Sequence, residues 1–151
     1  VAIDISDDAL KVAAYNKKYN NADYINLIKS DMFSSSECEQ YKNEDNRLDV
    51  IVSNPPYIPT KDIDELSEEV RLHDPVLALD GDTDGLKFYK AITKQSVNYL
   101  KENGYLCYEI GYNQAEDVRN IMEQCGYSGI KVIKDLAGLD RVVIGRLNNI
   151  N

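Results

Sequence analysis

Cysteine is scarce in this chain, where Cys38, Cys107 and Cys125 lie far apart and form no Cys-x-x-Cys pair. An odd number of widely spaced cysteines argues against a disulfide framework and against a zinc site, and it fits a reducing cytoplasm. Long apolar runs are missing as well: no stretch approaches the ~18 residues that span a bilayer, and no signal-peptide pattern opens the chain. We therefore expect a cytoplasmic protein without a membrane segment or a bound metal.

Basic residues are also in deficit. Lysine and arginine number 17 against 26 aspartates and glutamates, which gives a formal net charge of −9. Proteins that bind phosphate backbones need clustered Lys and Arg, so this balance opposes direct nucleic-acid binding and favours, weakly, a basic protein partner. The 151 residues, 43% hydrophobic and 28% charged, are enough for one soluble domain with a single core.

The apolar pattern predicts alternating strands and helices. We expect strands at 1–5, 22–28, 48–53, 104–110, 130–134 and 141–147, and helices at 7–20, 62–71, 86–101 and 114–125. Ser6 resembles an N-cap for the first helix, and residues 30–46 resemble a polar loop with some helical potential. This alternation implies an α/β fold with a mostly parallel sheet and right-handed crossovers, and the last two strands can pair as an antiparallel hairpin.

Three polar residues follow the ends of predicted strands: Asp4, Asp31 and Asn54. In open parallel sheets, ligands bind beyond the carboxyl ends of the strands. We therefore expect these three residues to lie near a ligand.

The segment after the third strand is rich in proline. Pro55, Pro56 and Pro59 remove backbone donors and fix φ, so the segment cannot continue the sheet. Pro55 also restricts Asn54 to extended geometry. The sequence therefore predicts a stiff corner that presents Asn54 and Tyr57 with little conformational entropy left to lose on binding.

This corner suits methylation of a planar amide or amine nitrogen, which is a poor nucleophile because its lone pair is delocalised. The Asn54 side-chain carbonyl and the Pro55 backbone carbonyl can accept the two N–H groups, and they stabilise the positive charge that develops as nitrogen attacks a sulfonium methyl. Tyr57 can stack on the planar group. No strong base is needed, so the lone His73 is no obstacle. The alternative, a turn that merely ends a strand, is disfavoured by the acidic residues at the other strand ends.

Several separate motifs, in order and along nearly the whole chain, resemble the release-factor-specific protein-(glutamine-N5) methyltransferases. The first is Asp49-Val-Ile-Val-Ser-Asn-Pro-Pro-Tyr-Ile-Pro59. The others are Glu69–Leu79, Asp84–Tyr89, Glu109–Gln114 and Asp135–Gly145. The resemblance implies transfer of a methyl group from S-adenosylmethionine to the glutamine of the Gly-Gly-Gln motif in peptide-chain release factors.

The resemblance also implies roles for individual residues. Asn54 and the carbonyl of Pro55 would bind the target amide, while Pro56 and Tyr57 would shape the glutamine pocket. Asp4 would bind the ribose hydroxyls of S-adenosylmethionine.

The resemblance further places the segment Asp31-Met32-Phe33 against the adenine of the cofactor, to which Asn54 would also contribute. From the residues alone, Asp4 could equally be a helix-side cap and Asp31 a loop acid.

The chain departs from the family pattern in two places. Asp74-Pro75 stands where the family usually has Glu-Pro, and no glycine precedes Gly81. We therefore expect residues 1–151 to be a partial catalytic domain with a Rossmann-like class I methyltransferase sheet and a carboxy-terminal antiparallel hairpin. The family's first strand, its glycine-rich cofactor loop and its amino-terminal helical domain would be absent. On its own such a fragment should bind S-adenosylmethionine weakly or not at all and be inactive.

Other functions stay open. An amino-methyltransferase acting on a nucleic-acid base (N6-adenine type) shares the Asn-Pro-Pro-Tyr loop, but the net charge and the later motifs oppose it. A ribosomal-protein glutamine methyltransferase is a close cousin, and a catalytically inert fragment is the third alternative.

Asp80–Gly85 imitates the start of a calcium-binding loop, but Ala91 stands where the bidentate glutamate belongs, so we expect a turn before a helix.

Overall fold

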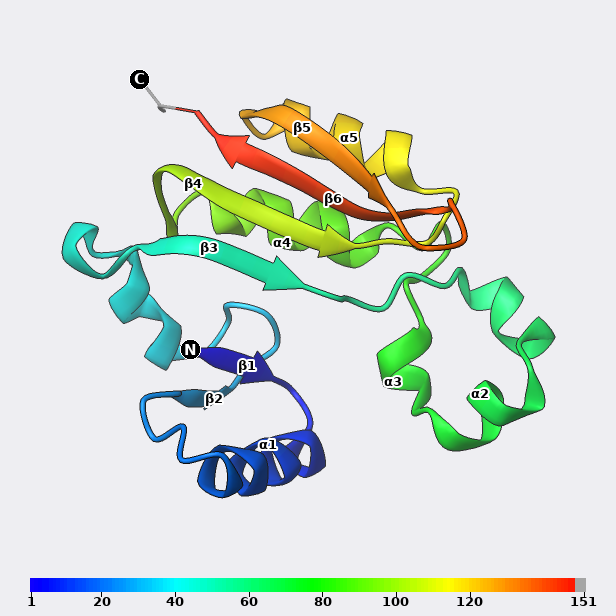
Figure 1. Cartoon of the computed structure of the whole chain (residues 1–151), viewed down its shortest axis with the longest axis horizontal. Coiled ribbons are helices and arrows are strands. Elements are labelled where there is room, and N and C mark those ends of the chain that lie inside the picture. Colours follow the sequence, from blue (N-terminus) through cyan, green and yellow to red (C-terminus); the bar gives the residue numbers. More distant parts are fainter. Residues whose placement is uncertain (149–151) are drawn as a thin grey trace. The chain divides into compact units, whose positions relative to one another are not determined.

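The computed structural model describes residues 1–148, which fall into two compact units, Val1–Asn46 and a second that begins at Arg47. Figure 1 labels the helices and strands of both. No helix in residues 1–148 is both long and apolar enough to cross a membrane.

The first unit contains a two-stranded parallel sheet and one long helix. Strand β1 (Ala2–Asp4) pairs with β2 (Leu27–Lys29), and α1 (Asp7–Tyr19) connects them. The Ser6 hydroxyl accepts a hydrogen bond from the Ala9 amide (3.3 Å), which confirms the predicted N-cap.

The second strand is shorter than the expected range 22–28. In the preceding turn, the Ala22 amide donates to the Lys17 carbonyl and the Ile25 amide donates to the Ala22 carbonyl. A longer strand would need these backbone groups for pairing with its neighbour. After β2, two 3₁₀ helices occupy part of the predicted polar loop, η1 (Ser36–Lys42) and η2 (Glu44–Asn46).

The second unit is built on a four-stranded mixed sheet in the order β3-β4-β6-β5. Its strands are β3 (Leu48–Ser53), β4 (Leu100–Glu109), β5 (Tyr127–Lys134) and β6 (Asp140–Leu147). β3 and β4 are parallel, whereas β6 pairs antiparallel with both β4 and β5. The carboxy-terminal hairpin is therefore confirmed, but across the two described sheets only half of the strand pairings are parallel, and the expectation of a mostly parallel sheet is wrong.

Two helices cover one face of this sheet, α4 (Lys87–Ser96) and α5 (Ala115–Gln124), as Figure 1 shows. The core between them and the sheet contains hydrogen-bonded tyrosines. The Tyr108 hydroxyl bonds Thr93 Oγ1 at 2.8 Å, and the Tyr127 hydroxyl bonds Ser96 Oγ at 2.7 Å. Burial of these rings thus leaves no hydroxyl without a partner.

Two predicted boundaries are wrong for the same reason. The helix expected at 86–101 ends at Ser96, and β4 begins at Leu100 rather than at 104. Leu100 pairs with Leu48 at the start of β3, and the Leu48 amide donates to the Tyr99 carbonyl (2.8 Å). Pairing with a distant strand overrides the local helical pattern.

The single helix expected at 62–71 is replaced by three short ones. These are η3 (Thr60–Glu65), α2 (Glu68–His73) and α3 (Val76–Leu79). Between η3 and α2 the backbone leaves the helical conformation, with ψ of 154° at Leu66 and 146° at Ser67. None of the residues in these three helices is fully buried, so no core contact enforces one continuous helix.

The buried tyrosines predict a loss of stability in alkaline solution. Burial raises the pKa of Tyr89, Tyr108 and Tyr127, in the last case to about 12. A tyrosine in the unfolded chain ionises near pH 10, so above that pH the unfolded state binds fewer protons. The free energy of unfolding, measured by urea titration, should fall as the pH rises above about 10.

Tyr127→Phe should make this decline shallower, because one ionisable ring is removed. Tyr24→Phe is the matched control, since Tyr24 is 88% exposed. Equal slopes for Tyr127→Phe and the unsubstituted protein would contradict the assignment.

Candidate functional site

The Asn-Pro-Pro-Tyr corner begins where β3 ends. β3 stops at Ser53, as the prolines predict, and no peptide bond in the corner is cis. Asn54 is exposed, Pro55 is buried, and Pro56 and Tyr57 are half-buried. Within residues 1–148, neither the Asn54 side chain nor the Pro55 carbonyl accepts a hydrogen bond from the protein. The two oxygens predicted to bind the target amide are thus unengaged.

The far end of the corner is fixed through the Tyr57 carbonyl. Gln114 Nε2 donates to this oxygen at 3.0 Å and to the Gly85 carbonyl at 3.4 Å. Gln114 Oε1 accepts the Gly111 amide at 3.0 Å. One buried side chain therefore joins three segments. The sequence places Gln114 in the motif Glu109–Gln114 and at the start of a helix, but nothing local predicts these contacts.

Glycines surround the same peptide because no side chain would fit. A Cβ on Gly85 would lie 2.3 Å from the Tyr57 carbonyl oxygen, and one on Gly81 would lie 2.9 Å from the Tyr57 Cα. A Cβ on Gly111 would lie 2.8 Å from Gln114 Oε1. Gly85 lies within the motif Asp84–Tyr89 and Gly111 within Glu109–Gln114, and the close backbone approach explains why glycine is required.

The carboxyl end of β4 and the beginning of β6 lie on another side of this region. Tyr89 donates its hydroxyl to the Glu109 carbonyl (3.0 Å), and burial raises its pKa. Arg141 Nη1 donates to the Ile110 carbonyl (3.4 Å) while its Nη2 lies 3.1 Å from Asp135. The bonds to Asp135 raise the pKa of Arg141, so it stays charged.

The acidic loop Asp80–Gly85 is occupied by internal bonds. The Asp80 carboxylate accepts the Asp82 amide (2.9 Å) and the Thr60 hydroxyl (2.7 Å). Asp82 pairs with Lys87 at 3.0 Å, and hydrogen bonding to this lysine lowers the pKa of Asp82 to about 2. The loop forms a turn ahead of α4, as predicted. Residues 1–148 hold no cluster of three or more His, Cys, Asp or Glu able to bind a metal.

Four of the five predicted cofactor residues, Asp4, Asp31, Met32 and Phe33, belong to the first unit, whereas the fifth, Asn54, belongs to the second. The Ser30 amide donates to the Asp4 carbonyl (3.0 Å), so Asp4 and Asp31 are neighbours at the carboxyl edge of β1 and β2. The Asp4 carboxylate is exposed, and its Oδ1 accepts the Ser6 amide at 2.8 Å. Met32 has a positive φ of 49°, and Phe33 is buried.

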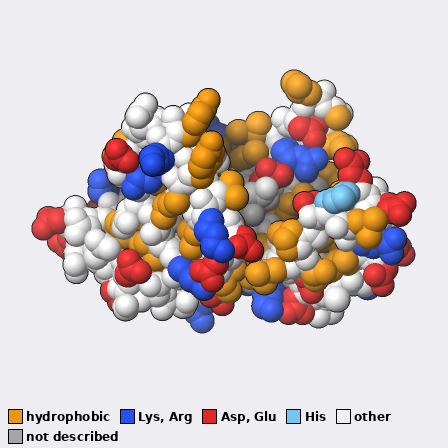
Figure 2. Space-filling view, turned by 90° about the horizontal axis from the view of Figure 1, so that it is seen from below, with side chains coloured by type: hydrophobic (Ala, Val, Ile, Leu, Met, Phe, Trp, Pro, Cys, Tyr) orange, Lys and Arg blue, Asp and Glu red, His pale blue; other side chains and the backbone are white. Residues whose placement is uncertain are grey.

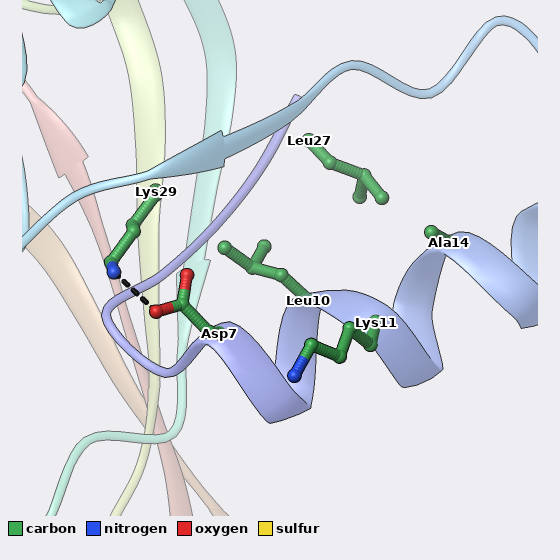
Figure 3. A pocket seen from close by; sticks show the side chains of 6 residues that line it. All are labelled: Asp7, Leu10, Lys11, Ala14, Leu27 and Lys29. Atoms are coloured by element: carbon green, nitrogen blue, oxygen red, sulfur yellow. Dashed lines mark hydrogen bonds and ion pairs between the residues drawn. The ribbon is translucent and has the colours of Figure 1, made fainter.

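Each unit also has a hollow that contains none of the predicted site residues. In the first unit, a hollow of about 640 Å³ lies between α1 and β2 (Figure 3) and is lined by Asp7, Leu10, Lys11, Ala14, Leu27 and Lys29. An Asp7–Lys29 ion pair of 2.5 Å closes one end and lowers the pKa of Asp7. α1 buries no residue completely, and its apolar residues Leu10 and Ala14 line this hollow.

In the second unit, a hollow of about 520 Å³ is lined by Val50, Tyr105, Cys107, Gly129, Lys131, Ile144 and Arg146. These residues alternate with the buried ones that face α4 and α5, so the hollow is on the other face of the sheet. Large apolar side chains are exposed elsewhere too, and Figure 2 shows such groups scattered among acidic and basic ones on one face.

A family model matches most of the chain. The description of this family is Eco57I restriction-modification methylase, and the match covers residues 3–121.

Two curated relatives are similar over nearly the whole chain. The release factor glutamine methyltransferase of Fusobacterium nucleatum is 42% identical over 144 residues, which cover 95% of this chain and 39% of the relative. The release factor glutamine methyltransferase of Clostridium acetobutylicum is 39% identical over 142 residues, with 93% and 48% coverage. The chain spans less than half the length of these relatives.

The fold is similar to that of a methyltransferase from Pyrococcus furiosus. The TM-score is 0.66 at 17% identity, covering 98% of this chain and 62% of that one. At this identity the likeness concerns the fold alone. It confirms an α/β methyltransferase fold of class I with a mixed sheet and carboxy-terminal antiparallel strands.

Substitution of Gly85 tests the packing around Tyr57. Gly85→Ala places a methyl group against the Tyr57 carbonyl at a residue with φ of 71°. Gly126→Ala is the matched control, because Gly126 also has a positive φ (90°) but nothing lies within 4 Å of its Cβ position. The control should lose about 1–2 kcal/mol of unfolding free energy from backbone strain alone.

Gly85→Ala should lose that amount plus about 1–3 kcal/mol for overpacking. Urea denaturation measures both losses. Equal losses in the two variants would show that the Tyr57 carbonyl is not packed against Gly85.

Proposed function

Because this chain belongs to the Eco57I restriction-modification methylase family and is a homologue of the release factor glutamine methyltransferases, we propose that the protein methylates a glutamine side-chain amide in peptide-chain release factors. The reaction class is methyl transfer to the amide nitrogen of a protein substrate. The two curated relatives carry this activity in their names, at about 40% identity along nearly the whole chain.

The observation that carries the proposal is the state of two oxygens at the corner. The exposed Asn54 side chain and the Pro55 carbonyl have no partner within residues 1–148. An amide NH₂ has two N–H donors, and these two oxygens can each accept one of them. Pro55 and Pro56 hold them on a backbone with restricted rotation, so little entropy is lost when the substrate binds.

The same oxygens supply the catalytic effect. As the amide nitrogen forms its bond to carbon, it loses electron density and its N–H groups become stronger donors. Acceptors already in place at Asn54 and Pro55 then bind the transition state more tightly than the ground state. Tyr57, half-buried beside Gly111, limits the rotation of the planar amide. A protonated amide nitrogen sheds its proton readily, so the mechanism requires no strong base.

The residues of the first unit fit S-adenosylmethionine, which supplies an electrophilic methyl group when bound. The Asp4 carboxylate is exposed at the carboxyl end of a parallel strand, and within residues 1–148 only one of its oxygens accepts a hydrogen bond, from the Ser6 amide. Its remaining acceptor capacity suits the hydroxyls of a ribose. Asp31, Met32 and Phe33 follow β2 beside it, and we assign them to the adenine side.

Residues 1–80 contain no glycine, and the chain spans 39% of the Fusobacterium nucleatum relative. We therefore infer that the glycine-rich cofactor loop lies outside residues 1–151.

The three thiols are free, which supports a cytoplasmic location.

The matching family model favours one second candidate, methylation of an amino group on a nucleic-acid base, because its description is a restriction-modification methylase. The net charge of −9 opposes it, since such an enzyme binds a phosphate backbone. The experiment is transfer of labelled methyl groups by the full-length protein to a release factor and, in parallel, to duplex DNA. Label on DNA alone would replace the proposed function by this second one.

Removal of the Asn54 acceptor should abolish most of the activity. In the full-length protein, Asn54→Ala should lower kcat about 10²-fold or more, because one of the acceptors for the developing charge is lost. The affinity for S-adenosylmethionine, measured by calorimetry, should remain nearly unchanged. Asn120→Ala, an exposed asparagine on α5, is the control. Wild-type turnover in Asn54→Ala would contradict the mechanism.

Asp4 should act on cofactor binding instead. Asp4→Asn keeps an oxygen that can accept the Ser6 amide, so this hydrogen bond remains. The variant loses the negative charge, and the affinity for S-adenosylmethionine should fall about 10-fold, the loss expected when one charge-assisted hydrogen bond is removed. Calorimetry on the full-length protein measures the change, with Asp23→Asn, an exposed acid of the same unit, as control. An unchanged affinity for S-adenosylmethionine would contradict the cofactor role of Asp4 and leave only its hydrogen bond to the Ser6 amide.

A further inference from the structure

Gln114 occupies an unusual position for a polar side chain. It lies at the N-cap of α5 and is 7% exposed. Its side-chain hydrogen bonds go to main-chain groups: the carbonyls of Tyr57 and Gly85 in two other segments, and the amide of Gly111 in the turn before α5. A side chain that served only to cap α5 would bond the amides of that helix's first turn, and this one does not.

We propose that Gln114 is the positioning residue of the Asn-Pro-Pro-Tyr corner: its amide holds the Tyr57 carbonyl and thereby sets the direction of the acceptors on Asn54 and Pro55. This inference rests on the proposed function and deepens it. Gln114 touches no reacting atom and acts through the backbone.

The backbone between these points transmits the constraint. Ser53 is held in β3 by its pairing with Tyr108, which fixes the start of the corner. The peptide group that joins Tyr57 to Ile58 fixes its end, because its carbonyl accepts from Gln114 (3.0 Å) and its N–H donates to the Leu79 carbonyl (3.0 Å). The residues between include two prolines with fixed φ, so the corner has few rotations left.

Only an amide satisfies all the partners. The Tyr57 and Gly85 carbonyls need a donor, and the Gly111 amide needs an acceptor at the same place. A methionine side chain has a similar length but no hydrogen-bond donor. A glutamate carboxylate also has no donor, so it cannot bond the two carbonyl oxygens. The amide is packed tightly against this backbone, since a Cβ on Gly85 would lie 2.3 Å from the Tyr57 oxygen and 2.8 Å from Gln114 Nε2.

The test compares Gln114→Met and Gln114→Glu with Gln124→Met, which removes an exposed amide from the same helix. In the full-length protein, both Gln114 variants should lower kcat for methylation of a release factor about 10- to 100-fold, the loss expected for acceptors displaced by ~1 Å. KM for S-adenosylmethionine should change less than about twofold, since Gln114 leaves cofactor binding alone. Gln124→Met should match the unsubstituted protein.

Amide hydrogen exchange supplies a readout that does not depend on activity. The Ile58 N–H belongs to the clamped peptide, so its exchange should accelerate about 10-fold or more in both Gln114 variants. Exchange of the Leu106 amide, in the middle of β4, should stay unchanged. An unchanged Ile58 rate, or a general acceleration that includes Leu106, would overturn the proposal, and so would a wild-type kcat.

The same experiment separates the two claims. If the unsubstituted full-length protein methylates no release factor, the proposed function fails, and the Ile58 exchange rate alone decides whether Gln114 holds the corner. If it methylates the release factor and the Gln114 variants do so equally well, the positioning role fails while the function stands.

Discussion

The peptide group between Tyr57 and Ile58 is the point on which the candidate site depends. Its carbonyl is bound by Gln114 and its N–H by Leu79, so neither polar group is left to water or to a different conformation. Gly81 and Gly85 lie against it, and any side chain there would displace it. The ends of three connections meet here: the corner after β3, the turn before α4 and the turn before α5. A corner anchored in this way can offer unengaged oxygens without collapsing onto the protein.

The chemistry that such a corner supports relies on neutral oxygens rather than on titratable groups. The ionisable residues with displaced pKa values serve other purposes. Tyr108 and Tyr127 bond to Thr93 and Ser96 in the core between sheet and helices. Asp82 binds a lysine in the turn before α4. A poor nitrogen nucleophile is assisted most by acceptors that need no reorganisation when charge develops, which is what rigid carbonyl groups provide.

Local sequence patterns predicted much of the fold. The Ser6 cap, β3 and its end at the prolines, α5 and the terminal hairpin all arise from features that act within a few residues. The errors came where a distant segment decides the outcome. β4 begins at Leu100 because Leu48 is available as its partner, and the helix expected at 62–71 breaks at Leu66 because no core contact holds it together.

The sequence by itself determined the stiff corner and the residue types that it presents, because proline restricts the backbone wherever it stands. It also determined the motif order that relates the chain to the methyltransferases. Only the tertiary structure decided that Asn54 is exposed, that Gln114 reaches the Tyr57 carbonyl, and that Gly85 must lack a side chain. Tyr57 and Gln114 are separated by 57 positions, and a contact over that separation depends on how the sheet and its helices pack, which no local pattern records.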